Sequence, residues 1–268
     1  MSIAINRDFK IDLVVIVQDE EKNINKLVRK KYGDNLIIVD SYSRDNTVNE
    51  LSQYTKQIYS QKFINFSVQK NYAISKSNNE WILTLDADEE LTEGAQEVIR
   101  ELVKKKDIDG YWFPRRNYIN DKTYLKHGYF YPDWQLRLFR NHKGYKYSGI
   151  IHAQIQIPEK KTRYIKDVEI LHSPERSKYN SWLSFFRLIN YIKIEGSDLA
   201  KSKTAATSFI SGIFLETARH FFRCYYRKRG FLDGYNGFRA AVIFGLYQGN
   251  IQMYAFFTRL FRYDTPEV

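Results

Sequence analysis

Four carboxylates follow a short apolar run, and this spacing can bind a charged ligand through a metal ion. The run from Trp81 to Leu85 is short, mostly apolar and bounded by polar residues, which is typical of a buried strand. The acids that follow it are Asp86, Asp88, Glu89 and Glu90. In an extended segment, side chains two residues apart point to the same side. Two carboxylates on one side are hard oxygen ligands that suit Mg²⁺ or Mn²⁺ carrying a phosphorylated substrate.

A bare Asp-x-Asp pair is also common in a solvated acidic turn, so the elements before it decide between the two interpretations. Ile11–Val17 and Leu36–Asp40 read as buried strands, and residues 57–59 read as a short one. Glu20 follows the first strand and Asp40 ends the second. Because parallel strands end at the same edge of a sheet, we expect Glu20, Asp40 and the pair at 86 and 88 to converge.

Helical patterns separate these strands. Helical spacing covers residues 23–31, 67–77 and 92–105, and Ser43 can cap a further helix that carries Val48 and Leu51. Strands alternating with helices at this pitch predict an α/β fold, a mainly parallel sheet with helices on both faces. Asn120 and Asp121 predict a turn, and residues 150–157 alternate as a strand.

The motifs around the acids resemble glycosyltransferase family 2. The similar segments are Val15–Ile24, Ile38–Thr47, Lys70–Ala73 and Asp86–Glu89. Proteins of that family have the GT-A fold, a Rossmann-like nucleotide-sugar-binding sheet with a metal-binding Asp-x-Asp. Pro132–Phe139 and Gly230–Gly234 are similar to a narrower branch, the lipopolysaccharide-core β-1,4-glucosyltransferase-like proteins.

The resemblance implies a role for most of the acids. It implies that Glu20 and Asp40 hold the nucleobase and that Lys70 and Asn71 lie near the nucleotide or sugar. It also implies that Asp86 contacts ribose and metal, and that Asp88 binds the metal directly. Asp19 stands where the family usually has Asn, and its role stays open.

Residues further along the chain are candidates for the rest of the site. The resemblance places Gln135 and Arg137 beside the donor sugar and diphosphate, where an Arg can hold phosphate oxygens; a surface salt bridge is the alternative. Tyr131 and Trp134 can stack on the apolar faces of acceptor sugar rings, or can simply pack in a β-layer. His152 can be a third metal ligand or can orient the diphosphate, although a lone His in a strand is often structural.

Ala153 is the main departure from the pattern. Related enzymes often have Glu directly after the His at this place, and that acid is missing here. An inverting transferase needs a carboxylate to take the proton of the acceptor hydroxyl. Our candidate for this base is Asp133, with Glu89 as the second choice.

The charge of the chain is concentrated at its C-terminal end. Net charge is +11, and residues 176–262 hold 14 Lys or Arg and 4 Asp or Glu. We expect residues 1–173 to form the nucleotide-sugar-binding and catalytic domain, and residues 174–268 to form a basic, aromatic-rich helical extension. Helices covering 177–201, 205–229 and 233–261, the last interrupted by glycines, can bind a membrane surface, contact another subunit to form a homo-oligomer, or pack on the sheet.

The composition limits the partners and the compartment. Cys224 is the single cysteine, so the chain has no intrachain disulfide and no cysteine-based metal site. We expect no signal peptide at its start and no membrane-spanning run. No nucleic-acid motif accompanies the basic residues. We therefore expect a cytoplasmic protein, peripheral at the inner face of the plasma membrane.

Together with the resemblance, which implies inversion, these observations predict a metal-dependent inverting glycosyltransferase that moves a hexose from a UDP-sugar to a cell-surface glycan or lipid-linked saccharide. One alternative is a sugar nucleotidyltransferase, but residues 18–21 lack the Gly-rich basic loop that such enzymes carry after the first strand. The other is a non-catalytic membrane or assembly scaffold with a transferase fold, which the missing acid at position 153 favours.

Overall fold

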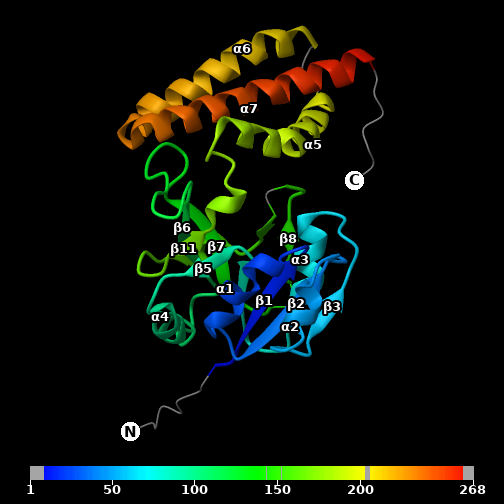
Figure 1. The fold of residues 1–268 in the computed structure, drawn as a ribbon, viewed down its shortest axis with the longest axis vertical. Coiled ribbons are helices and arrows are strands. Elements are labelled where there is room, and N and C mark those ends of the chain that lie inside the picture. Colours follow the sequence, from blue (N-terminus) through cyan, green and yellow to red (C-terminus); the bar gives the residue numbers. More distant parts are fainter. Residues whose placement is uncertain (1–8, 143, 152, 203–205, 262–268) are drawn as a thin grey trace. The chain divides into compact units, whose positions relative to one another are not determined.

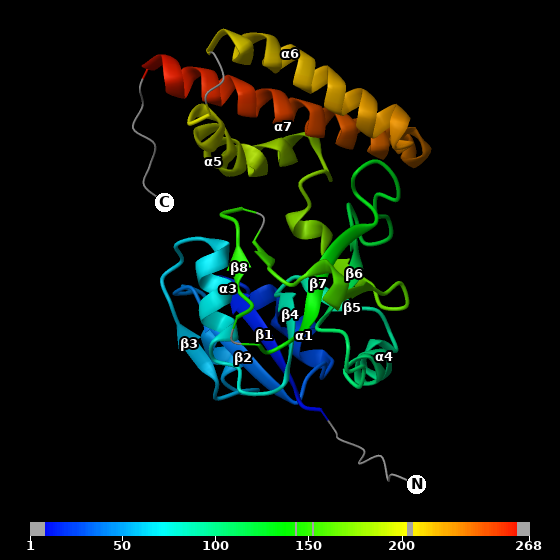
Figure 2. The same ribbon diagram turned by 180° about the vertical axis from the view of Figure 1, so that it is seen from behind.

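The computed structural model describes residues 9–142, 144–151, 153–202 and 206–261. The chain divides into two compact units (Figures 1 and 2). The first contains residues 1–115 and 134–172, and the second contains residues 116–133 and 173–268. The division expected from the sequence left the segment 116–133 with the first unit, whereas the structure groups it with the helices that follow 173. The roles assigned to the two parts stay predictions.

A mixed sheet forms the centre of the first unit. Across the described residues its strand order is β3-β2-β1-β4-β7-β6-β11-β5, with β10 paired to β6. The bounds of the strands are β1 Ile11–Val17, β2 Asn35–Asp40, β3 Ile58–Ser60, β4 Trp81–Asp86, β5 Glu89–Leu91, β6 Gly110–Asn117, β7 Asp133–Arg140, β10 Thr162–Tyr164 and β11 Ile170–His172.

Parallel pairing joins the four strands at one end of this order. β1 pairs in parallel with both β2 and β4, and β2 pairs in parallel with β3. β7 runs antiparallel to β4, and β11 runs antiparallel to β5. The predicted α/β class is confirmed, and the antiparallel strands lie in the half of the sheet that the sequence pattern described less well.

Successive residues of β1 enter two separate hydrophobic cores. Leu13 and Val15 pack in a core with helices α1 (Ile24–Arg29) and α4 (Ala95–Leu102), whereas Val14 packs in a second core with Ala73 of α3 (Phe66–Ile74). Both faces of the sheet are therefore covered by helices. This burial on two faces explains why β1 reads as a continuous apolar run rather than an alternating one.

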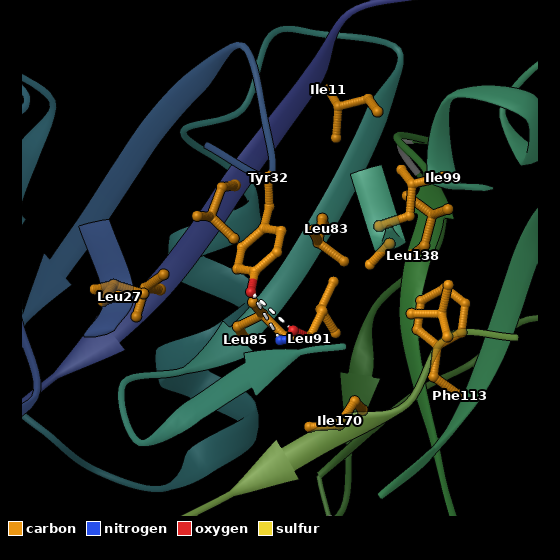
Figure 3. Close-up of a cluster of buried hydrophobic side chains, with 14 of the residues drawn as sticks. Ile11, Leu27, Tyr32, Leu83, Leu85, Leu91, Ile99, Phe113, Leu138 and Ile170 are labelled. Carbon is orange, nitrogen blue, oxygen red and sulfur yellow. Dashed lines mark hydrogen bonds between the residues drawn. The ribbon is translucent and has the colours of Figure 1, made fainter. Parts of the chain in front are cut away.

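The first core also fixes the short strand β5 (Figure 3). The buried hydroxyl of Tyr32 donates a hydrogen bond to the carbonyl oxygen of Leu91 and accepts one from the Leu91 N–H, at 3.2 and 2.9 Å. Leu91 packs there with Leu85 and Ile170. These contacts position the strand that begins at Glu89.

The helices of the first unit are shorter than predicted. They are α1 Ile24–Arg29, α2 Thr47–Leu51, α3 Phe66–Ile74 and α4 Ala95–Leu102. Asn46 precedes α2, so the predicted cap at Ser43 is wrong. Ser43 instead donates from its hydroxyl to Asp40, at 2.5 Å, because the loop bends back toward the end of β2.

The strand predicted over residues 150–157 is mostly absent from the described residues. Only Gln154–Ile155 form strand β9, which pairs with β8 at Tyr147–Ser148.

The second unit consists of a turn segment and a group of helices. Tyr118 and Tyr124 form an isolated antiparallel bridge around the predicted turn at residues 120 and 121, which is confirmed. The helical segments are η4 Trp182–Leu188, α5 Ile189–Ala200, α6 Ala206–Phe222, the π-helical turn η5 Arg223–Arg227, η6 Gly230–Asp233 and α7 Gly234–Phe261. Among the described residues, no helix is both long enough and apolar enough to cross a membrane.

Glycines do not interrupt α7 as the sequence suggested; they let it approach α6. A Cβ at Gly249 would lie 2.0 Å from the Thr217 hydroxyl oxygen, and one at Gly245 would lie 2.8 Å from the Thr217 carbonyl oxygen. The two helices lie side by side in both views (Figures 1 and 2). The missing side chains therefore allow close packing of the two helices.

Candidate active site

The predicted acids converge on the carboxyl edge of the parallel strands. In the strand register, Asp40 of β2 lies beside Val17 of β1, and Asp86 of β4 lies beside Ile16 on the other flank of β1. Glu20 lies three residues after the end of β1 and is buried. Such an edge is where open α/β sheets bind ligands.

The loops after β1 and β2 are hydrogen-bonded to each other. Glu20 donates its N–H to the Thr47 hydroxyl at 2.8 Å, and Arg44 donates its N–H to the Asp19 carboxylate at 2.7 Å. The Asp40 carboxylate accepts from the backbone and hydroxyl of Ser43. Glu20 and Asp40 thus belong to a pair of loops, after β1 and after β2, that hydrogen bonds hold together as one double loop. Their contact with a nucleobase stays a prediction.

Two residues of this double loop have left-handed backbone angles. Asp19 has φ of 53°, a region that Asn and Asp enter more readily than other residues. The role of Asp19, which the sequence left open, therefore includes allowing the left-handed turn of the backbone at this position. Tyr42 has φ of 61° and an exposed ring, although bulky residues rarely adopt this angle.

Asp86 is held by two cations. Its carboxylate lies 3.2 Å from Lys70 Nζ of α3 and 2.8 Å from Arg137 Nη2 of β7. Burial disfavours the charged form of Asp86, but Arg137 and Lys70 outweigh it and hold the pKa of Asp86 well below its usual range. Burial lowers the pKa of Lys70, and Asp86 opposes that change. Asp86 is therefore ionised at neutral pH.

Glu89 joins Asp86, Lys70 and Arg137 in a cluster of charged side chains, the ion cluster, which also includes Arg115. Its fully buried carboxylate lies 2.6 Å from Arg137 Nη2 and 3.0 Å from Arg115 Nη1, and it accepts the Asp86 N–H at 3.1 Å. Burial works against the charged form of Arg137, but Asp86 and Glu89 raise its pKa above the usual value. Glu89 thus orients two arginines, and its role as a catalytic base stays a prediction.

Asp88 faces a histidine that the sequence did not single out. The backbone turns at Ala87 and Asp88 between β4 and β5, so the expectation of an extended Asp-x-Asp segment is wrong. Asp88 Oδ2 lies 3.2 Å from Nε2 of His172, whose register partner on β5 is Glu89. The buried Nδ1 of His172 has no hydrogen-bond partner among the described residues. The sequence signal that could have singled out His172 is its position as a polar residue at the end of the short strand β11.

Asn71 and Gln135 are close in sequence to Lys70 and Arg137, respectively. The Asn71 amide donates to the Tyr147 carbonyl oxygen at 2.9 Å and accepts the Tyr147 N–H at 2.7 Å, so it joins α3 to β8. Gln135 is half-buried on β7, two residues before Arg137. Their contacts with donor stay predictions.

The aromatic candidates have packing partners. Trp134 packs edge-on against Tyr164 with ring centroids 4.9 Å apart. Tyr131 belongs to the second unit and packs against Tyr124 at 5.5 Å. In that same unit, Asp133 accepts a hydrogen bond from the Asn117 amide at 3.0 Å. Acceptor binding by the two aromatic residues and base catalysis by Asp133 stay predictions.

The predicted metal ligands are only partly described. His152 lies outside the described residues. Within the part of the chain that the structure describes, no three His, Cys, Asp or Glu side chains form a metal-binding group. Asp88 Oδ2 and His172 Nε2, 3.2 Å apart, are atoms of types that bind divalent ions, and metal binding by Asp88 stays a prediction.

Relatives of the chain are glycosyltransferases. It is 25% identical over 243 residues to an uncharacterised glycosyltransferase of Rickettsia felis, covering 88% of this chain and 85% of that protein. It is 28% identical over 170 residues to the lipopolysaccharide core biosynthesis glycosyltransferase LpsC of Rhizobium meliloti, covering 59% and 61% of the two chains.

Solved structures show lower similarity. S. aureus TarS 1–349 in complex with UDP has a TM-score of 0.43 and 12% identity, covering 84% of this chain and 75% of that one. Mycobacterium tuberculosis glucosyl-3-phosphoglycerate synthase in complex with Mn²⁺, UDP and glucosyl-3-phosphoglycerate has a TM-score of 0.34 and 16% identity, covering 40% of this chain and 44% of that one.

The sequence model described as glycosyl transferase family 2 matches residues 12–158, more than half of the chain. That match contains every acid of the carboxyl edge together with Lys70, Arg115 and Arg137. The chain therefore belongs to glycosyl transferase family 2.

Proposed function

We propose that this glycosyltransferase moves a hexose, with inversion, from a UDP-sugar to a cell-surface glycan or lipid-linked saccharide. The observation that carries the proposal is the placement of Asp40 and Asp86 on the two flanks of β1, at one sheet edge, with Lys70 and Arg137 already beside Asp86. Family membership supplies the reaction class.

The ion cluster suits a diphosphate because its basic groups outnumber its acids. Lys70, Arg115 and Arg137 face the two carboxylates Asp86 and Glu89. Arg137 is almost fully buried and held on two sides, so it is already oriented before a ligand arrives. Lys70 is the more accessible of the two cations on Asp86, and we propose that it turns from Asp86 to the phosphate oxygens.

Asp88 and His172 would hold a divalent ion, Mg²⁺ or Mn²⁺, with Asp86 close by in the chain. Such an ion neutralises charge on the departing nucleoside diphosphate. Glu89 keeps Arg115 and Arg137 in place, and Asp40 would accept a hydrogen bond from the ring N–H of the nucleobase. Asp133 is our candidate for taking the proton of the acceptor hydroxyl.

Turnover of UDP-sugars by a Lys70→Met variant tests this assignment. Loss of one charged hydrogen bond costs about 1.5–3 kcal/mol, so kcat/KM should fall roughly 10- to 100-fold. Lys76→Met is the matched control, because Lys76 lies two residues beyond α3 and stacks on the ring of Tyr72. Equal rates for the two variants would contradict the role of Lys70.

Thermal shift with a panel of nucleotide sugars and Mn²⁺ identifies the donor. A ligand that binds only the native state stabilises it by about 2.7 kcal/mol at 100 times its dissociation constant. The proposal predicts that UDP-sugars raise the melting temperature most. Stabilisation by no nucleotide sugar, together with no turnover, would instead favour the scaffold alternative.

A further inference from the structure

The turn between α6 and α7 combines exposed aromatic side chains with exposed positive charge. We define the basic aromatic turn as residues 222–235, which include the π-helical turn η5 and the short helix η6. Its exposed large side chains are Phe222, Tyr226, Phe231, Leu232 and Tyr235, each 44–62% exposed. Exposed large apolar side chains gathered within so short a segment are characteristic of interaction sites.

The surface charge of this turn is entirely positive. Its basic side chains, all exposed, are Arg223, Arg227, Lys228 and Arg229. Its single acid, Asp233, is turned inward: the carboxylate accepts the N–H groups of Lys126 and His127 at 2.9 Å and lies 2.8 Å from His127 Nδ1. The acid therefore does not neutralise the arginines at the surface.

Internal packing holds the turn in this conformation. Gly128 donates its N–H to the Lys228 carbonyl oxygen at 2.9 Å, and Cys224 is fully buried. A Cβ on Gly237 would lie 1.9 Å from the Gly230 carbonyl oxygen, so the backbones touch. The exposed aromatic side chains therefore project from a backbone that internal packing and hydrogen bonding hold in place.

Two neighbouring features extend the same surface chemistry. The indole N–H of Trp182, itself 45% exposed, donates to the Tyr235 hydroxyl at 3.0 Å. An apolar groove of about 500 Å³ is lined by residues of α6 and α7 and includes Phe222 of the turn. Trp and Tyr favour the headgroup level of a bilayer, and an apolar groove suits an acyl chain.

We propose that the basic aromatic turn binds the surface of an anionic phospholipid bilayer. The arginines and Lys228 meet the lipid phosphates while Phe231 and Leu232 enter the acyl boundary. Positive charge argues for lipid over a second copy of the chain, because two copies of this turn would repel each other. The proposal concerns the second unit alone and holds whether or not the first transfers hexose.

Vesicle co-sedimentation of the full chain without nucleotide tests the proposal. We expect binding to vesicles of equal parts phosphatidylcholine and phosphatidylglycerol, and little binding to phosphatidylcholine alone. Each basic residue near an anionic surface contributes about fivefold in affinity, so Arg227→Gln, Lys228→Gln and Arg229→Gln together should weaken binding about 100-fold. The matched control replaces the exposed Lys104, Lys105 and Lys106 of the first unit with Gln and should bind like the wild type.

A second readout does not depend on charge. Brominated acyl chains in the anionic vesicles should quench the fluorescence of Trp182, and Trp182→Phe should remove most of that quenching. Equal loss of binding in the triple variant of the turn and in the triple lysine control would overturn the proposal. So would a wild-type chain that ignores anionic vesicles but forms a dimer that Phe231→Ser and Leu232→Ser dissociate, because the turn would then be a subunit contact.

Discussion

Replacing Glu89 with glutamine should destabilise the first unit. Both sides of the Glu89 carboxylate face donors: two arginines at one oxygen and the Asp86 N–H at the other. A glutamine places its NH₂ group against one of these donors, whichever way it turns. Removing one partner of a buried ion pair costs about 3–5 kcal/mol in the free energy of unfolding. Because the glutamine keeps one oxygen that can still accept a hydrogen bond, we expect a loss at the lower end, about 3 kcal/mol.

For a unit of this size, a loss of about 3 kcal/mol lowers the melting temperature by about 6–12 °C. Calorimetry and urea denaturation measure it. Glu90→Gln is the control, because Glu90 is partly exposed and lies 4.0 Å from Lys30, a separation at which an ion pair adds little. Equal denaturation midpoints for the two variants would refute the orienting role. Normal stability with lost turnover in Glu89→Gln would instead support Glu89 as the base.

Three further variants or treatments test separate features of the structure. Tyr42→Asn should raise the free energy of unfolding by up to about 1 kcal/mol in urea, because Asn tolerates the left-handed backbone better; a decrease would contradict the strain. Burial raises the pKa of Cys224 to about 11, so a thiol reagent at pH 8 should label it only after urea is added, and rapid labelling of the native chain would show it to be accessible. Hydrogen bonds from Arg100 lower the pKa of Asp34, so its stabilisation is complete above its unfolded pKa of about 3.9 and is lost as pH falls through the lower folded value. Asp34→Asn should therefore destabilise the chain at pH 7 and progressively less as pH falls below the unfolded pKa, and a pH-independent difference would contradict the linkage.

The sequence predicted those parts of the fold that depend on local pattern. β1, β2 and β4 were recognisable because burial on both faces makes each of them a short apolar run. Their acids then followed from the shared edge of parallel strands. Ser43 was misplaced because a serine before a helix and a serine closing a loop onto Asp40 look the same in sequence.

The rest of the site depends on long-range pairing that no local pattern contains. His172 comes near Asp88 only because β11 pairs antiparallel with β5, and the register sets His172 beside Glu89. Arg115 meets Glu89 across 26 residues of chain. The glycines of α7 looked like interruptions, since their contacts lie on a different helix.

Calorimetric titration of UDP with and without Mn²⁺ tests most directly whether this carboxyl edge binds a nucleotide through a metal ion. The wild type should bind UDP more tightly with Mn²⁺, and Asp88→Asn should lose that difference while the exposed-site control Glu93→Gln retains it. An Asp88→Asn variant that folds and keeps the full Mn²⁺ dependence would contradict the proposed metal site.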